Sequence, residues 1–396
     1  MSGAMTFAAY LVAMAVTRGD LAREAASSTP FRLDLDPDTS RQTVVDREQG
    51  VYLGHVSTVL LDDHHTILAA YPKGHGAGAI VLKRSIDGGR TWSERLPTPP
   101  SWQTSKETPT LFALGPRSLI LFSGLFPIRA ARSTDDGETW SELAPIGDFG
   151  GIVAMGGVAR CPDGKLAAFF HDDGRFFTSN GSATGTFALY QTESIDAGAT
   201  WSAPRSIWSG SEIHLCEPGV VPSPDGSALA LLLRENRRVR NSHVMLSRDG
   251  AATWTQPREL PRVLTGDRHI ARYGPDSRLV VVYRCMQPDD PWNGDWVAWV
   301  GRWDDLADAA SPSPPPAPTG SGSAAPSPSQ AQYFVRLKDN LTAWDCGYSG
   351  LELLPDGTFV ATTYGTWTPD TSPWILSVRF TLDELDRMRA AAIPTR

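Results

Sequence analysis

The stretch Ser-Ile-Asp-Gly-Gly-Arg-Thr-Trp at residues 85–92 decides the fold of this chain, because it recurs. The pattern Ser-x-Asp-x-Gly-x-Thr-Trp stands again at residues 133–140 and 194–201, and a copy at 247–254 has Ala in place of the central Gly. The copies begin 48, 61 and 53 residues apart, which is the spacing of a repeated supersecondary unit. Asp accepts hydrogen bonds in a tight turn, Gly tolerates positive φ, and Thr-Trp suits the start of a strand. Each copy therefore predicts one β-hairpin, and four hairpins at this spacing indicate a β-propeller.

A second repeat runs in step with the first. Turns of the Pro-Asp-Gly type precede short β-rich runs at residues 166–170, 229–233, 279–283 and 358–363. Looser versions near residues 61–64 and 114–117 bring the count to six units. We predict an all-β, six-bladed propeller, with units that open near Gly54, Glu107, Gly151, Glu217, Asp267 and Gly347. Seven blades would require residues 31–53 to contribute more than a closing strand.

Composition supports a single propeller domain over residues 31–396. The chain has 396 residues, with 41% hydrophobic residues, 36 Gly and 31 Pro, which fits many short strands joined by tight turns. The net charge of −8 argues against nucleic acid as a partner. The four Cys show no CxxC spacing, so we expect buried free thiols. No apolar stretch is long enough to cross a membrane, and we expect a monomer.

Three segments are expected to lie outside the propeller blades. Residues 1–30 are interpreted as a leader or a disordered segment, because residues 5–16 are apolar like a secretory core but lack a basic flank. Localisation stays open on this evidence, with a secreted or periplasmic site favoured over the cytoplasm. Residues 310–331 form a Pro/Ser-rich insertion that we expect to be disordered, with seven Pro in residues 310–330. Thr381-Leu-Asp-Glu384 is a capping box that predicts a short C-terminal helix over residues 385–392.

The repeated Asp phrase resembles the Asp boxes of the sialidase superfamily, whose members carry them on propeller blades. Members of this family bind a sugar carboxylate with three arginines, attack with a Tyr activated by a Glu, and protonate the leaving group with an Asp. The segment CGYSGLELLPDG at residues 346–357 resembles the one around the nucleophilic Tyr, which implies that role for Tyr348. The segment CEPGVVPSPDG at residues 216–226 resembles the one with the partner Glu, which implies Glu217. Arg234, at the end of the same hairpin, resembles the second arginine.

Other positions depart from the family pattern. His55 stands where the family has its first Arg, and His75 lies on the hairpin that carries the acid/base Asp. The third Arg has no clear counterpart, because neither Arg284 nor Arg302 is well placed. An imidazole exchanges protons near pH 6.5, so a His replaces the Asp as a proton donor. Because one Arg of three survives, sialic acid itself does not follow as the substrate.

Further candidates are weighed against structural roles. Glu107 opens the second unit and either faces the axis or forms a salt bridge at the strand end. Arg268 opens the fifth unit and supplies a missing cation, whereas Arg132 beside the second Asp box either contacts an acidic sugar or lies on the rim. The charges of residues 234–240 are expected to be solvated in a hairpin turn. Neighbours on a strand point to alternate faces, so residues 171–173 (His-Asp-Asp) cannot converge on an ion, and neither a metal nor a cofactor is expected.

Three functions remain open. The first is a sialidase-like exo-glycosidase acting on an acidic glycan, with Tyr348, Glu217 and His75 as its reacting groups and Arg234 as a substrate contact. The second resembles propeller lyases that release terminal rhamnose from glucuronate by β-elimination, because they use paired histidines such as His55 and His75. The third is a propeller that binds glycans without catalysis. The Tyr348–Glu217 pair favours the hydrolase.

Overall fold

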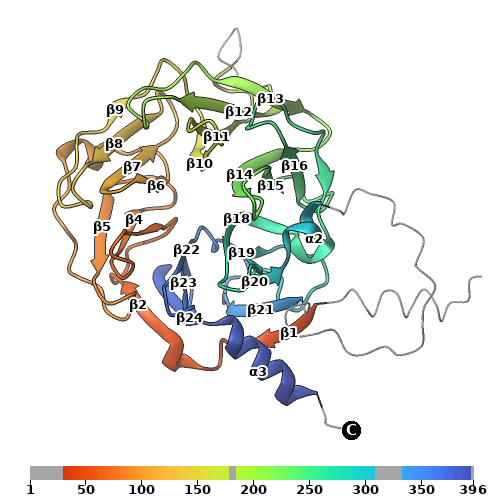
Figure 1. Cartoon of the computed structure of the whole chain (residues 1–396). Helices are drawn as coiled ribbons and strands as arrows, with labels where there is room; N and C mark the ends of the chain where they lie inside the picture. The colour runs from red at the N-terminus through yellow and green to blue at the C-terminus, as the bar shows by residue number, and fades with distance from the viewer. Residues whose placement is uncertain (1–29, 178–183, 308–331, 394–396) are drawn as a thin grey trace, which may run out of the picture.

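Six β-sheets stand around one central axis, as Figure 1 shows for the computed structural model. The structure describes residues 30–177, 184–307 and 332–393, so residues 1–29 and 308–331, for which a leader and an insertion are predicted, lie outside it. Within the described residues the six predicted blades are confirmed, and no helix there is long and apolar enough to cross a membrane.

The first three blades follow the chain from the inner strand outward. The first consists of β3 (Ser57–Leu60), β4 (Ile67–Pro72) and β5 (Ile80–Ser85). The second consists of β6 (Pro109–Gly115), β7 (Ser118–Ser123), β8 (Arg129–Ser133) and β9 (Ala144–Pro145). The third consists of β10 (Ile152–Arg160), β11 (Leu166–Asp172), β12 (Phe187–Ser194) and β13 (Arg205–Gly210). The fourth blade consists of β14 (Leu215–Pro222), β15 (Leu229–Glu235), β16 (His243–Ser247) and β17 (Arg258–Glu259). The predicted runs at residues 166–170 and 229–233 lie within β11 and β15.

The last two blades use strands from both ends of the described chain. The fifth contains β18 (Gly266–Tyr273), β19 (Leu279–Cys285), β20 (Trp296–Gly301) and β21 (Tyr333–Lys338), with β1 (Phe31–Asp34) added in parallel to β21. The sixth contains β22 (Gly350–Leu353), β23 (Phe359–Gly365), β24 (Trp374–Phe380) and β2 (Gln42–Asp46). Residues 31–53 thus supply a closing strand and one extra strand, so the seven-bladed alternative is not what the structure shows.

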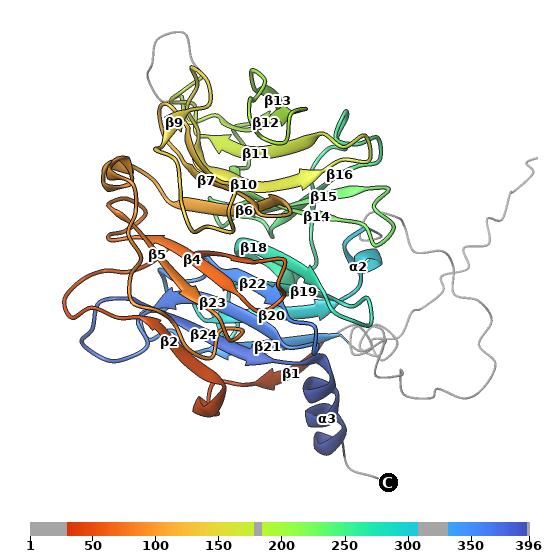
Figure 2. The same ribbon diagram turned by 60° about the vertical axis from the view of Figure 1, so that its left-hand side comes forward.

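The helices of the described residues are few and peripheral. They are α2 (Trp303–Ala307), α3 (Leu382–Ala392) and the 3-10 turns η1 (Thr39–Arg41), η2 (Pro100–Thr104) and η3 (Arg262–Leu264). The predicted C-terminal helix is confirmed as α3, in which the hydroxyl of the N-cap Thr381 accepts a hydrogen bond from the Glu384 amide at 3.1 Å. It lies beside β1 at the edge of the propeller (Figure 2).

The four Asp phrases form hairpin turns on the outer part of the blades. In the first, the Asp87 carboxylate accepts hydrogen bonds from the amide and hydroxyl of Thr91 at 2.9 and 2.6 Å, and the Ser85 hydroxyl accepts the Gly89 amide at 2.8 Å. In the second to fourth boxes, hydrogen bonds from the Thr and Ser of the box lower the pKa of the Asp to about 2. In the first box burial raises the pKa of Asp87, but the hydrogen bonds have the larger combined effect, and the pKa is again about 2. The phrase is therefore a self-contained turn.

The inner strands approach one another closely around the axis. A Cβ at Gly219 would lie 2.1 Å from the His269 carbonyl oxygen, and one at Gly350 would lie 1.8 Å from the Thr58 hydroxyl oxygen. Only Gly allows this approach of neighbouring blades. A cavity of about 470 Å³ runs between these strands, and Tyr348 and Arg268 belong to its lining.

Candidate functional site

Side chains are aimed at the axis by an unusual backbone conformation at the start of the inner strands. His55, Val153, Glu217 and Arg268 have φ of 55°, 48°, 52° and 54°, a region that non-glycine residues rarely adopt. The register of β10, β14 and β18 with the next strand shifts at these places, as in a β-bulge. Such bulges re-aim side chains and are common beside functional sites, at a conformational cost of roughly 1–3 kcal/mol each.

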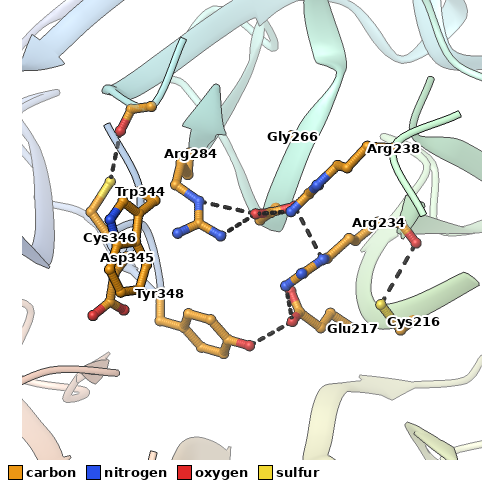
Figure 3. Close-up of polar contacts among 12 residues, drawn as sticks. Cys216, Glu217, Arg234, Arg238, Gly266, Arg284, Trp344, Asp345, Cys346 and Tyr348 are labelled. Atoms are coloured by element: carbon orange, nitrogen blue, oxygen red, sulfur yellow. Dashed lines mark hydrogen bonds and ion pairs between the residues drawn. The ribbon is translucent and has the colours of Figure 1, made fainter. Parts of the chain in front are cut away.

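Tyr348 and Glu217 form a hydrogen-bonded pair across the axis (Figure 3). The Tyr348 hydroxyl donates to Glu217 Oε1 at 2.6 Å, and Arg234 Nη1 donates to the same oxygen at 2.7 Å. Burial opposes the charge of Glu217, but Arg234 and the Tyr348 hydrogen bond hold its pKa below its ordinary value. Burial and the Glu217 charge raise the pKa of Tyr348 well above its ordinary value. The resting pair is therefore a phenol that donates to a carboxylate.

Three arginines converge on one buried carboxylate behind this pair. Asp267 is 0% exposed, and it contacts Arg234 Nε at 3.2 Å, Arg238 Nη2 at 2.7 Å and Arg284 Nε at 3.0 Å. Burial would raise the pKa of Asp267, but the charges of Arg234 and Arg284 hold it well below its ordinary range. Figure 3 shows the side chains of Arg234, Arg238 and Arg284 turned toward one another.

Arg268 lies at the axis and is buried. It is 5% exposed, its guanidinium lies 5.7 Å from the centre of the Tyr348 ring, and Nη1 donates to the Gly156 carbonyl at 2.8 Å. Among the described residues it makes no ion pair. A buried cation without a counter-ion is unfavourable, and burial lowers the pKa of Arg268.

Glu107 faces the same region from the second blade. Its Oε2 accepts the Val153 amide hydrogen, and burial together with the nearby Glu217 charge raises its pKa to about 8. Glu107 is therefore largely protonated at pH 7. Among the described residues Glu107 makes no salt bridge, so the alternative of a salt bridge at the strand end is not what the structure shows.

The two predicted histidines meet beside Tyr348. The ring centres of His55 and His75 lie 4.8 Å apart, and His55 lies 4.5 Å from Tyr348. His55 is buried, and its Nδ1 accepts the Gly76 amide at 3.2 Å. Burial and the neighbouring His75 lower the pKa of His55 well below its ordinary value. The side chain of His75 is 63% exposed, and its Nδ1 lies 3.0 Å from the Tyr52 hydroxyl and 3.3 Å from Asp345.

The site has a positive local charge in an acidic chain. Four guanidinium groups (Arg234, Arg238, Arg268, Arg284) face three carboxylates (Glu217, Asp267 and Asp345), while Glu107 is largely neutral. This balance favours an anionic ligand.

One group of side chains offers metal-ligating atoms. The atoms of His55, His75 and Asp345 lie within 4.8 Å of one another in the described part of the chain. Both ring nitrogens of His55 and the Nδ1 of His75 already have hydrogen-bond partners, so we describe the group as a hydrogen-bonded cluster.

The structure brings most of the predicted residues together, and it also adds others. Arg132 does not join them, because its Nη2 donates to the Ala197 carbonyl in the next Asp box. Arg284, which is not expected to be well placed as the third arginine, lies in the site but binds Asp267. The expectation that Arg238 is a solvated charge is wrong, because Arg238 also binds Asp267. Sequence reasoning missed Asp345, Tyr52 and Tyr364 as members of the site. The only signal was that Asp345 adjoins the segment that carries Tyr348.

Comparisons with known proteins agree on the architecture. The BNR repeat-like domain family matches residues 126–289, and no curated protein matches the chain. A protein of unknown function from Dyadobacter fermentans has a TM-score of 0.64 at 15% identity, over 86% of this chain and 97% of that one. The intramolecular trans-sialidase from Ruminococcus gnavus has a TM-score of 0.56 at 14% identity, over 85% of this chain and 95% of that one. The NanB sialidase from Streptococcus pneumoniae has a TM-score of 0.57 at 11% identity, over 87% and 71%. The chain thus shares the propeller fold of these structures, as the sequence predicted, and residues 126–289 are similar to the BNR repeat-like domain.

Proposed function

We propose that this protein is an exo-acting glycosidase that cleaves the terminal glycosidic bond of an acidic glycan. The observation that carries the proposal is the 2.6 Å hydrogen bond from Tyr348 to Glu217, because a phenol paired with a carboxylate base is an activated nucleophile. Tyr nucleophiles are a known exception to the two-carboxylate scheme of glycosidases. Structural similarity to sialidases is consistent with this chemistry.

The proposed reaction uses three side chains. Tyr348 Oη bonds to the anomeric carbon as the glycosidic C–O bond breaks; Glu217 takes the phenol proton, and the protonated imidazole of His75 gives a proton to the leaving oxygen. Water then attacks the anomeric carbon and gives a proton to His75, while Tyr348 leaves and takes its proton back from Glu217. Of the two histidines, His75 is the proton carrier in this scheme, because His55 is buried with both ring nitrogens in hydrogen bonds.

Arg268 is the group we assign to the acidic function of the sugar. The other three arginines of the site already bind Asp267, whereas Arg268 makes no ion pair among the described residues. A carboxylate beside Arg268 would neutralise a cation that burial disfavours. Arg234 holds Glu217 and contacts the sugar from the same side. Glu107, protonated at pH 7, is left as a hydrogen-bond donor to a sugar oxygen.

A lyase is the second candidate, and the proximity of His55 and His75 favours it. In this reaction Arg268 neutralises a uronate carboxylate, His75 takes the C5 proton, and the C4–O bond breaks as the C4–C5 double bond forms. The leaving oxygen takes a proton from Tyr348. The products are a free sugar, such as rhamnose, and an unsaturated uronate.

One experiment separates the functions. The protein is incubated with sialosides and with rhamnosyl-glucuronate glycans, and released sugars and ultraviolet absorbance are followed. Free sugar without new absorbance supports the hydrolase, and absorbance of an unsaturated uronate supports the lyase. Binding of these glycans with neither product would support a propeller that binds glycans without catalysis.

Site variants test the assigned roles. Tyr348→Phe is expected to lower the hydrolytic rate by at least about 100-fold, since it removes the nucleophile. Tyr273→Phe is the matched control, because that hydroxyl bonds the Pro222 carbonyl away from the site. His75→Ala is expected to abolish either reaction, with the exposed His65→Ala as its control. Full activity of His75→Ala would remove the acid/base assignment.

A further inference from the structure

Asp345 is the centre of a hydrogen-bonded cluster beside His75. Its side chain is nearly buried on the connection between β21 and β22. Tyr52 Oη lies 2.9 and 3.0 Å from its two oxygens, Tyr364 Oη lies 3.1 Å from Oδ1, and His75 Nδ1 lies 3.3 Å from Oδ2. Three different segments of the chain thus supply the partners of one carboxylate.

The protons of this cluster can be assigned by counting donors and acceptors. Burial, together with the charge of Asp345, raises the pKa values of Tyr52 and Tyr364, so both phenols keep their single proton. Each phenol donates that proton to Asp345, which leaves the Tyr52 oxygen as an acceptor. The two atoms near His75 Nδ1 are then both acceptors, so Nδ1 carries a hydrogen. The Nε2 atom of His75 is left for the substrate.

His55 is held in the opposite tautomer. Its Nδ1 accepts the Gly76 amide hydrogen, so the ring proton lies on Nε2 and is donated to Tyr364 Oη at 3.3 Å. The Tyr364 proton is thereby directed to Asp345. The His55 ring stacks on Tyr364 and meets the His75 ring edge to face, each with centres 4.8 Å apart.

We infer that Asp345 is a positioning residue for His75, which it holds directly and through Tyr52 in the Nδ1–H form with Nε2 facing the reaction. This inference rests on the proposed function, because it assigns a role to the partners of the proposed acid. A fixed tautomer matters because proton transfer at the leaving oxygen needs the same ring nitrogen in every turnover.

Charged and polar groups from several elements surround His75. Tyr52 and His55 face His75 from the segment before β3, and Asp345 faces it from the segment before β22. Tyr364, at the end of β23, contacts His55. The charge of Arg284, at the end of β19, acts to lower the pKa values of Tyr52 and His55. Asp345 is the one anion in this set. Its loss therefore removes the charge that favours a hydrogen on Nδ1 of His75.

The kinetic test compares leaving groups in Asp345→Asn. When the leaving group is a sugar hydroxyl, which needs a proton to depart, kcat/KM is expected to fall about 10- to 100-fold, within the range that general acid catalysis contributes. With an activated aryl leaving group, which departs without a proton, a fall of no more than a few-fold is expected. An equal fall on both substrates, or no fall, overturns the inference. Asp339→Asn on the same connection is the matched control.

A spectroscopic arm works without turnover. Nitrogen-15 NMR of the histidine side chains reports the tautomer, and the signals of His75 are those that disappear in His75→Ala. We expect the Nδ1–H form in the unaltered protein and a mixture in Asp345→Asn. A predominant Nε2–H form in the unaltered protein overturns the inference. If no glycan is cleaved, the proposed function fails and this measurement still decides the role of Asp345.

Discussion

The charge of Asp267 compensates three arginines of the site, so its removal should strongly destabilise the folded protein. It is fully buried and is the shared partner of Arg234, Arg238 and Arg284. Asp267→Asn keeps the shape and one acceptor oxygen but removes the negative charge. Three guanidinium groups would then remain close together, and of these Arg234 would keep its ion pair with Glu217.

The size of the effect follows from burial. Removing one partner of a buried ion pair typically costs 3–5 kcal/mol, because the remaining charge stays uncompensated. The lower end applies here, since Asn keeps a hydrogen-bond acceptor and the side chain of Arg238 is 30% exposed and can turn into solvent. We therefore expect the free energy of unfolding to fall by about 3 kcal/mol. With an unfolding entropy of about 2.1 cal/mol/K per residue, this lowers Tm by about 4 °C.

The assay is thermal unfolding at pH 7 at one fixed scan rate. Asp136→Asn is the control, because it removes the same charge from an exposed pair with Arg117, and such pairs contribute at most about 1 kcal/mol. Adding Arg238→Gln to Asp267→Asn removes one of the crowded cations and is expected to recover part of the loss. An unchanged Tm in Asp267→Asn, or a double variant less stable than the single one, would refute the reasoning.

Acid adds a second check on Asp267. Because its pKa in the folded protein lies below the unfolded value of about 3.9, its contribution is complete above that pH and is lost as pH falls. The stability difference between the unaltered protein and Asp267→Asn is therefore expected to narrow only below about pH 3.9.

Two further predictions concern backbone strain and a raised pKa. Gly198→Ala is expected to lower the free energy of unfolding by about 1–2 kcal/mol, because φ is +81° and the new Cβ would lie 2.7 Å from Leu114 Cδ1. In the fourth Asp box Ala251→Gly removes the strain of a positive φ of 68° but also removes a buried methyl group, so the free energy of unfolding is expected to change by no more than about 1 kcal/mol. Denaturant titrations in which Ala251→Gly is the more destabilising of the two variants would contradict this. Glu107 binds its proton more tightly in the folded state, with a pKa of about 8, so the protein loses stability as pH rises from about 4.3 to 8. Glu107→Gln is expected to flatten that decline in a Tm series from pH 5 to 9, and parallel curves for both proteins would disprove the assignment.

The blades could be predicted from the sequence because each is a local unit. A turn such as residues 85–92 satisfies its own hydrogen bonds within a few residues, so its pattern is readable wherever it stands. Tyr348 and Glu217 were predictable for a similar reason, because the residues around each form a recognisable segment. The register of six such units then brings the two together although they are 131 residues apart.

The cluster around Asp345 had no such local pattern. Tyr52 lies 293 residues before Asp345 in the sequence, and Tyr364 lies 19 residues after it. Their contacts depend on where separate blades place their inner ends. The meeting of Arg238 and Arg284 could not be predicted for the same reason. Arg238 belongs to a run of charges in a turn and Arg284 lies at the end of a strand, and both reach Asp267, which lies between them in the sequence.

The arrangement of cations bears on which ligand the site selects. A substrate carboxylate placed among Arg234, Arg238 and Arg284 would compete with Asp267, an internal carboxylate that is already desolvated and fixed by the fold. An internal group of this kind has no association entropy to lose, whereas a bound sugar does. Arg268 has no such competitor among the described residues. Arg268 alone therefore attracts the acidic group of a ligand less strongly than three unoccupied arginines would. The site favours ligands whose single acidic group lies within reach of Arg268 when the sugar lies at Tyr348.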